Sequence, residues 1–241
     1  MTVFRPYSLL HLLSLAGVAV AIWLFVAAGR AWRGRPAERR LAVAVASVAL
    51  AFRVGTVIWN YSRPHRSFVE ALPLQVCDLA AVACAIALLS KGGWSYALAY
   101  YWGLTLSLQG LLQPDLDAGP VAPAFWLFWL HHALIVGTAV YLVVVRGYRP
   151  GWSDWRIAAW GGVGYALVAF GLNVLFDTNF GYLGRSRPDY PTLIDWLGPW
   201  PWRAAVMVFL ALGAMALLAL PWSLAGITRR GVARLDAGVD R

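Results

Sequence analysis

The chain has 241 residues, of which 61% are hydrophobic and only 13% are charged, and it contains 14 Trp. Its mean hydropathy is +0.64. This composition excludes an ordinary water-soluble domain and a disordered chain, and it indicates an integral membrane protein.

Seven apolar runs follow one another along the sequence, each close to the roughly 20 residues that cross a bilayer as a helix. In chain order, we predict helices at residues 8–28, 41–61, 70–90, 94–112, 123–145, 155–176 and 201–220. A cleaved signal peptide is a rival interpretation of the first run, because the chain starts with the basic segment MTVFR and Ala27 and Ala28 are small. We therefore predict one all-α domain over residues 1–241, a seven-transmembrane-helix bundle with a short basic tail at about 226–241.

The net charge of +9 raises the alternative of a nucleic-acid partner. The distribution of the charge argues against it, because most of the 20 Lys and Arg residues fall in the loops on one side of the seven-helix zigzag. They are Arg30, Arg33, Arg35, Arg39, Arg40, Lys91, Arg146, Arg149, Arg156, Arg229, Arg230, Arg234 and Arg241. By the positive-inside rule, we expect the N-terminus outside and the C-terminus in the cytoplasm of a multi-pass protein of the cell membrane, with no nucleic-acid partner.

Polar residues inside the predicted helices share one depth. Arg53 precedes the outer end of the second run by about eight residues, and Cys77 and Asp78 follow the outer start of the third run by about as many. At 1.5 Å per residue they lie about 10 to 12 Å deep, and His131 and His132 lie equally deep in the fifth run. Further polar residues gather near the outer helix ends, and they are Gln109, Gln113, Asn173 and Asp177.

Several of these residues recur at helical spacing and therefore share a helix face. The sets are Arg53, Thr56 and Asn60; Gln75 and Asp78; Thr105, Gln109 and Gln113; and Asn173 and Asp177. Polar stripes of this kind line a bundle interior or a water-filled cavity, so we expect a polar cavity open to the outer leaflet.

Each feature also has a structural interpretation. Arg53 and Asp78 fit an ion pair between neighbouring helices, Cys77 fits a small core residue, and the amide stripes fit interhelical hydrogen bonds. Cys77 and Cys84 are about 10.5 Å apart along one helix, too far for a disulfide. Neither HExxH nor a Cys or His cluster with zinc spacing is present, so we expect no metal and no cofactor.

Five segments carry a family resemblance. They read ALPLQVCDLAAV, YYWGLTLSLQGLLQPDL, FWLFWLHHALIV, FDTNFGYLGR and LIDWLGPWPW. Between about Arg53 and Trp222 the chain resembles the YwaF-like bacterial membrane proteins, the family that includes transmembrane protein 164. The resemblance implies a seven-helix fold related to the androgen-induced-gene hydrolases of fatty-acid esters. The animal member of that family is described as a phospholipid acyltransferase that uses a Cys and a His, so the resemblance also implies this kind of activity. It implies Cys77 as the nucleophile and His132 as the histidine, with His131 as a local departure.

The resulting hypothesis is a membrane-embedded acyl-transfer enzyme, either a phospholipid acyltransferase or a lipid-ester hydrolase, whose partner is a membrane phospholipid or lysophospholipid. Cys77 attacks an ester after His132 takes its proton, Asp78 orients a histidine or pairs with Arg53, and Gln75, Gln109 or Asn173 stabilises the oxyanion. The expected contacts of the headgroup phosphate are Arg63, Arg66, Arg185 and Arg187. A transporter, channel or small-molecule binder is the rival class, and a purely structural role is the third.

Overall fold

The computed structural model describes residues 4–62, 67–185 and 193–239, and within these ranges its regular structure is entirely helical. The elements are α1 (Leu9–Ala31), α2 (Pro36–Tyr61), α3 (Val76–Leu89), α4 (Trp94–Trp102), the π-helix η1 (Gly103–Ser107), α5 (Leu108–Leu112), α6 (Pro123–Val144), α7 (Trp152–Phe176), the 3₁₀-helices η2 (Phe180–Tyr182) and η3 (Leu193–Leu197), and α8 (Trp202–Val239). The expectation of an all-α protein is confirmed for this part of the chain.

Five of the described helices are long and apolar enough to cross a membrane: α1, α2, α6, α7 and the Trp202–Leu224 part of α8. The predicted fourth helix is the continuous run of α4, η1 and α5, with a π-helical segment in its middle. The predicted tail carries on the helix of α8 as far as Val239.

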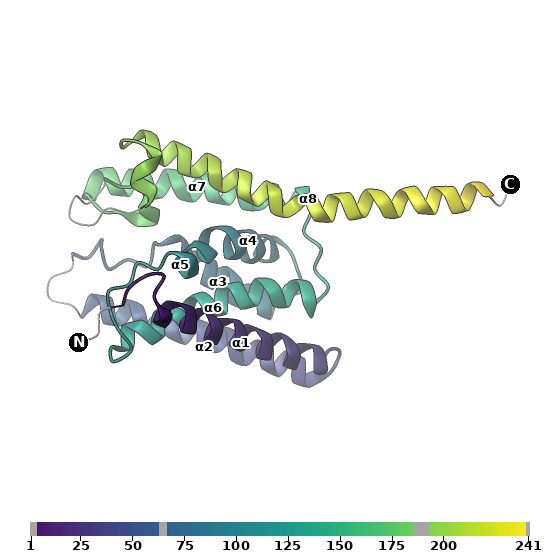
Figure 1. The fold of residues 1–241 in the computed structure, drawn as a ribbon, viewed down its shortest axis with the longest axis horizontal. Helices are drawn as coiled ribbons and strands as arrows, with labels where there is room; N and C mark the ends of the chain where they lie inside the picture. Colours follow the sequence, from purple (N-terminus) through teal and green to yellow (C-terminus); the bar gives the residue numbers. More distant parts are fainter. Residues whose placement is uncertain (1–3, 63–66, 186–192, 240–241) are drawn as a thin grey trace.

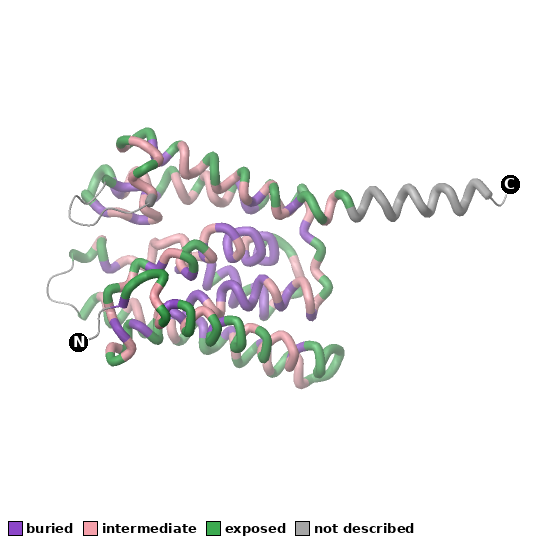
Figure 2. Tube along the Cα trace, in the orientation of Figure 1, coloured by how far each residue is buried: buried purple, intermediate pink, exposed green. Residues whose placement is uncertain are grey.

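The helices run along the long axis of the molecule, and α8 extends past the others to the C-terminus (Figure 1). α7 and α8 lie side by side and contact the rest of the bundle chiefly through α4. The buried residues concentrate on α3, α4 and α6 (Figure 2). α3 fits this central place because Ala80, Ala81, Ala83, Ala85 and Ala87 are all buried, and small side chains let neighbouring helices approach closely.

α3 is shorter than the sequence predicted. We expected a helix from residue 70, but the helix begins only at Val76. Pro73 lacks a backbone N–H and disfavours helical geometry in the residue before it, so helical structure does not extend back through this position. Gln75 is extended, and its N–H donates to Asp78 Oδ2 at 3.2 Å, which caps the new helix start. Fourteen residues make a helix of about 21 Å, well short of the roughly 30 Å of a hydrocarbon core.

The extended residues before α3 are held by other parts of the protein. The Tyr165 hydroxyl donates to the Leu74 carbonyl at 2.9 Å, and the Gly181 N–H donates to Gln75 Oε1 at 2.9 Å. Non-helical backbone at membrane depth is tolerated only where protein or water supplies its hydrogen bonds. α7 and the segment after it supply them here, so α3 begins inside the bundle.

The opposite end of α3 is fixed by one arginine that follows α6. Arg146 Nη1 donates to the Ala87 carbonyl at 2.9 Å, and its Nη2 donates to the Leu88 carbonyl at 2.7 Å. Its Nε donates to Glu38 at 3.3 Å, and Glu38 also accepts from the Tyr141 hydroxyl at 2.6 Å. A cation at the C-terminus of a helix satisfies the last carbonyls and complements the helix dipole. The arginine thereby joins the ends of α2, α3 and α6.

Candidate functional site

The candidate site lies at the start of α3, where three helices bring four side chains together. Cys77 and Asp78 occupy the second and third positions of α3, His131 comes from α6, and Arg53 comes from α2. The Cys77 Sγ, one Asp78 carboxylate oxygen and one His131 ring nitrogen all lie within 4.8 Å of one another. We call Arg53, Cys77, Asp78 and His131 the thiol site.

The Asp78 carboxylate lies between Arg53, His131 and the backbone of Gln75. Its Oδ1 accepts a hydrogen bond from Arg53 Nη1 in an ion pair, and both side chains are 11% exposed. The same oxygen lies 4.0 Å from His131 Nε2, while Oδ2 accepts the N–H of Gln75. The ion pair considered in the sequence analysis is therefore present, and it neutralises the buried carboxylate.

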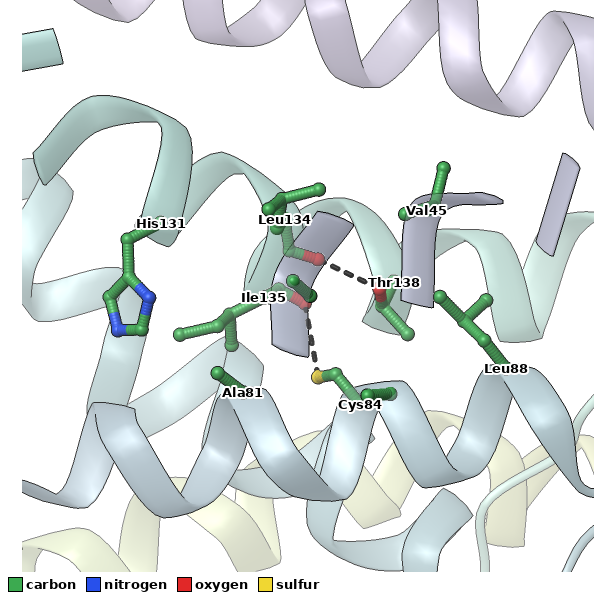
Figure 3. A pocket seen from close by; sticks show the side chains of 10 residues that line it. Val45, Ala81, Cys84, Leu88, His131, Leu134, Ile135 and Thr138 are labelled. Atoms are coloured by element: carbon green, nitrogen blue, oxygen red, sulfur yellow. Dashed lines mark hydrogen bonds between the residues drawn. The ribbon is translucent and has the colours of Figure 1, made fainter. Parts of the chain in front are cut away.

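His131 carries a buried nitrogen without a hydrogen-bond partner. Its side chain is 9% exposed, its ring stacks on Phe52 at 5.7 Å between centroids, and Nε2 has no partner among the described residues. Unpaired buried polar atoms are rare in folded proteins, and they often mark a reactive or ligand-binding position. The ring points from α6 towards α3, at one end of a small cavity between α2, α3 and α6 (Figure 3). That cavity has a volume of about 10 Å³, enough for one water molecule.

His132 has a different environment. Its Nδ1 lies 2.9 Å from the Phe128 carbonyl oxygen, and a side chain at Gly110 would overlap its ring. Adjacent residues of a helix point about 100° apart, so one face of α6 cannot present both rings to Cys77. The structure places His131, the neighbour of the expected His132, in the cluster with Cys77 and Asp78.

Two amide side chains named as oxyanion donors hold loops in place. Gln75 Oε1 accepts the Gly181 N–H. The Asn173 Oδ1 accepts from the Thr178 hydroxyl at 2.9 Å and from the Phe180 N–H at 2.7 Å, and its Nδ2 donates to the Phe180 carbonyl at 3.0 Å. These bonds close the turn that follows α7.

The remaining predicted residues lie away from this cluster of contacts. Gln109 is exposed on α5, and Gln113 and Asn60 are half-buried at helix ends. Asp177 is exposed and ends α7 in the left-handed conformation. Of the four arginines assigned to phosphate, Arg185 is exposed and lies over the Trp200 ring, 5.3 Å from its centroid. The other three, Arg63, Arg66 and Arg187, lie outside the described residues.

Tyr165 is a site residue that the sequence reasoning missed. It is half-buried in the middle of α7, and its hydroxyl donates to the carbonyl of Leu74, three residues before Cys77. A phenol in apolar surroundings needs a hydrogen-bond partner, and that need is the signal the sequence offered.

The thiol site contains three side chains of metal-ligand type that sequence spacing concealed, because His131 comes from a different helix. The Arg53 guanidinium already binds Asp78 and places a positive charge beside any cation held there. The group therefore fits an acid–base cluster better than a cation site. Cys77 and Cys84 are free thiols, and Cys84 Sγ faces the Ile135 carbonyl at 3.7 Å.

The fold and the site together define a multi-pass α-helical membrane protein with a thiol, an imidazole and an ion pair at the internal start of a short helix. A family model described as the TMEM164 family matches residues 6–219, and the chain belongs to that family. Comparisons with curated proteins and with solved structures found no match. The resemblance to the transmembrane protein 164 family is thus confirmed.

Proposed function

We propose that this protein is a membrane-embedded enzyme that transfers acyl groups from lipid esters, as a phospholipid acyltransferase or a lipid-ester hydrolase. The observation that carries the proposal is the thiol site, in which a thiol, an imidazole and a carboxylate lie within 4.8 Å at the start of α3. A nucleophile beside a base that is oriented by a third group is the arrangement used for covalent acyl transfer.

Cys77 is the nucleophile of the proposed reaction, and His131 is its base. His131 takes the thiol proton, and the thiolate sulfur attacks the ester carbonyl carbon. The ester C–O bond breaks, and the departing lysolipid oxygen takes the proton from His131, leaving a thioester on Cys77. A lysophospholipid hydroxyl or water then attacks the thioester, His131 removes its proton, and the sulfur leaves as the thiol. The proximity of His131 matters because a thiol buried without a base is a poor nucleophile.

The proposed substrate is a membrane phospholipid or lysophospholipid held in the outer leaflet of the cell membrane. Counting α3 and the run from α4 to α5 as spans gives seven, with the N-terminus outside and the basic loops in the cytoplasm. α3 falls about 9 Å short of a 30 Å hydrocarbon core, which supports a site just below the outer headgroups, where the ester bonds lie. Arg185 is a candidate contact for the headgroup phosphate.

Four single variants, reconstituted in vesicles of defined phospholipids and assayed by mass spectrometry of exchanged acyl chains, test the assignment. We expect Cys77→Ala and His131→Gln to lower turnover at least 100-fold. His132→Gln and Cys84→Ala are the matched controls and should keep most of the activity. Full activity in Cys77→Ala would overturn the mechanism, and loss in His132→Gln alone would return the role of base to His132.

A covalent intermediate separates the enzyme from a transporter or a lipid binder. Incubation of the wild-type protein with an activated acyl donor should leave a hydroxylamine-sensitive acyl group on Cys77, detected by mass spectrometry of peptides. Acylation that persists in the Cys77→Ala protein at another residue would count against the assignment.

A further inference from the structure

The turn between α1 and α2 carries positive charge that its own side chains do not compensate. Its arginines are all exposed, and none of them takes part in an ion pair among the described residues; they are Arg30, Arg33, Arg35, Arg39 and Arg40. Glu38 is the only acidic residue among residues 1–69 of the sequence. Its carboxylate is already taken up by Arg146 and by the Tyr141 hydroxyl. Because Arg146 also binds the last carbonyls of α3, this turn lies at the opposite end of α3 from the thiol site.

A groove on α2 lies beside this charge. It has a volume of about 400 Å³ and is lined by Pro36, Arg39, Arg40, Val43 and Ala44. Residues four apart share a helix face, so each arginine lies one turn from an apolar side chain of the lining. The volume is in the range of sites that hold small molecules. The groove therefore offers two guanidinium groups at one end and an apolar surface at the other.

The apolar end of the groove continues along α2 as an exposed stripe. The stripe consists of Val43, Leu50, Val54 and Ile58, which are all exposed. They follow one another at intervals of seven, four and four residues, so they share one face of the helix. An exposed apolar surface of this kind, bordered by charge, marks a contact with the membrane. The continuity of the groove with this stripe favours a lipid over a free phosphate or a nucleic acid.

The charge of the groove selects among lipids. Guanidinium groups bind phosphate oxygens in a forked geometry. A zwitterionic headgroup also brings an ammonium, which would need a carboxylate, and Glu38 is engaged with Arg146. Clusters of basic residues beside a membrane-spanning helix bind anionic headgroups. The groove therefore suits a phospholipid with net negative charge.

We propose that this groove binds an anionic phospholipid of the leaflet at the basic end of the bundle. Arg39 and Arg40 hold the phosphate, and an acyl chain lies along the stripe that starts at Val43. The site is separate from the thiol site, so the inference does not rest on the proposed acyl transfer. A ligand that binds only the folded protein stabilises it, so the lipid should also raise the unfolding temperature.

Native mass spectrometry of the full chain in detergent, titrated with phosphatidylglycerol or with phosphatidylcholine of the same acyl chains, tests the proposal. We expect the first phosphatidylglycerol to bind at least 10-fold more tightly than the first phosphatidylcholine. Arg39→Gln/Arg40→Gln should weaken phosphatidylglycerol binding by about 10- to 30-fold and abolish the preference. Both arginines are exposed, so the unfolding temperature without lipid should not change.

Two further variants separate the groove from the general charge of this end. Arg149→Gln/Arg156→Gln is the matched control, because it removes two exposed arginines beside α6 and α7, outside the groove, and it should keep the affinity. Val43→Trp fills the groove while keeping both guanidinium groups, and it should weaken binding about as much as the loss of the arginines.

Equal weakening in the two double variants would refute the groove, because binding would then follow net charge alone. Equal affinity for the two lipids, or unchanged binding in Val43→Trp, would refute it as well. Glycerol 3-phosphate supplies the same phosphate without acyl chains, and it should not displace phosphatidylglycerol at equal concentration. Displacement by glycerol 3-phosphate would identify a site for a free anion and overturn the assignment to a lipid.

Discussion

Asp78 connects three parts of the molecule through two oxygen atoms. Its Oδ1 holds Arg53 of α2 and faces His131 of α6, and its Oδ2 caps the start of α3 through the N–H of Gln75. A buried ion pair gains little over apolar packing, but removing one partner leaves the other charge buried and uncompensated. The residue therefore bears on stability as well as on the proposed chemistry.

Asp78→Asn should destabilise the protein by about 3 to 5 kcal/mol, because Arg53 loses the charge that compensates it. Thermal unfolding in detergent, followed by tryptophan fluorescence, measures the change. The double variant Arg53→Gln/Asp78→Asn removes both charges and should recover part of the loss. Asp177→Asn, at an exposed carboxylate, is the control with little expected effect. A double variant no more stable than Asp78→Asn would show that the ion pair is not the cause.

At this scale the sequence singled out the residues of the thiol site but not which of the two histidines lies beside Cys77 and Asp78. Arg53, Cys77 and Asp78 stand out because polar side chains are rare inside apolar helices. The choice between His131 and His132 depends on which face of α6 meets α3. A step of one residue turns that face by about 100°, and α6 is apolar on every side, so periodicity could not settle it.

At the scale of elements, α3 is held at both ends by groups from other helices. Asp78 and Arg53 fix its start, and Arg146 binds the carbonyls of Ala87 and Leu88 at its end. Burial lowers the pKa of Arg146, but contacts with Tyr96 and Glu38 outweigh this effect and raise the pKa above its usual value. The guanidinium therefore stays charged at any pH at which the protein is folded.

Arg146→Ala should lower the free energy of unfolding by at least about 2 kcal/mol, because hydrogen bonds from a charged group to the last carbonyls of α3 are lost. Arg146→Lys keeps the charge but not the forked geometry, so an intermediate loss is expected. Arg149→Ala, at an exposed arginine of the same loop, is the matched control. The same unfolding assay decides the matter, and equal stability of the 146 and 149 variants would contradict the anchoring role.

The boundaries of α1, α6 and α7 lie within about three residues of the predicted ones, whereas α2 begins at Pro36, before the predicted start at 41, and α8 continues past the predicted end at 220. The start of α3 was predicted too early, because the expected helix was carried back through Pro73 to Glu70. The extended path of the residues before α3 depends on Pro73 and on acceptors and donors from Tyr165 and Gly181, which are distant in sequence. The π-helical segment Gly103–Ser107 leaves no mark in hydropathy.

On the scale of the whole molecule, the two ends of the bundle differ in charge, and this difference predicts the orientation in the membrane. Lys91 lies in the loop between α3 and α4, Asp117 lies in the loop between α5 and α6, and both are exposed. In a protein with Cys77 and Cys84 replaced by Ala, Asp117→Cys should react with a membrane-impermeant thiol reagent on intact cells. Lys91→Cys should react only after lysis. The reverse pattern would place the thiol site in the cytoplasmic leaflet.

The ion pair between Arg53 and Asp78 also constrains how the chain enters the bilayer during synthesis. A lone arginine or aspartate at the centre of an inserting helix costs about 2.5 to 3.5 kcal/mol. The two residues are on consecutive helices, so insertion of α2 and α3 as a hairpin lets each charge neutralise the other before either faces lipid. We therefore expect α2 and α3 to insert together, and a pause in synthesis between them to leave an unpaired arginine at the insertion machinery.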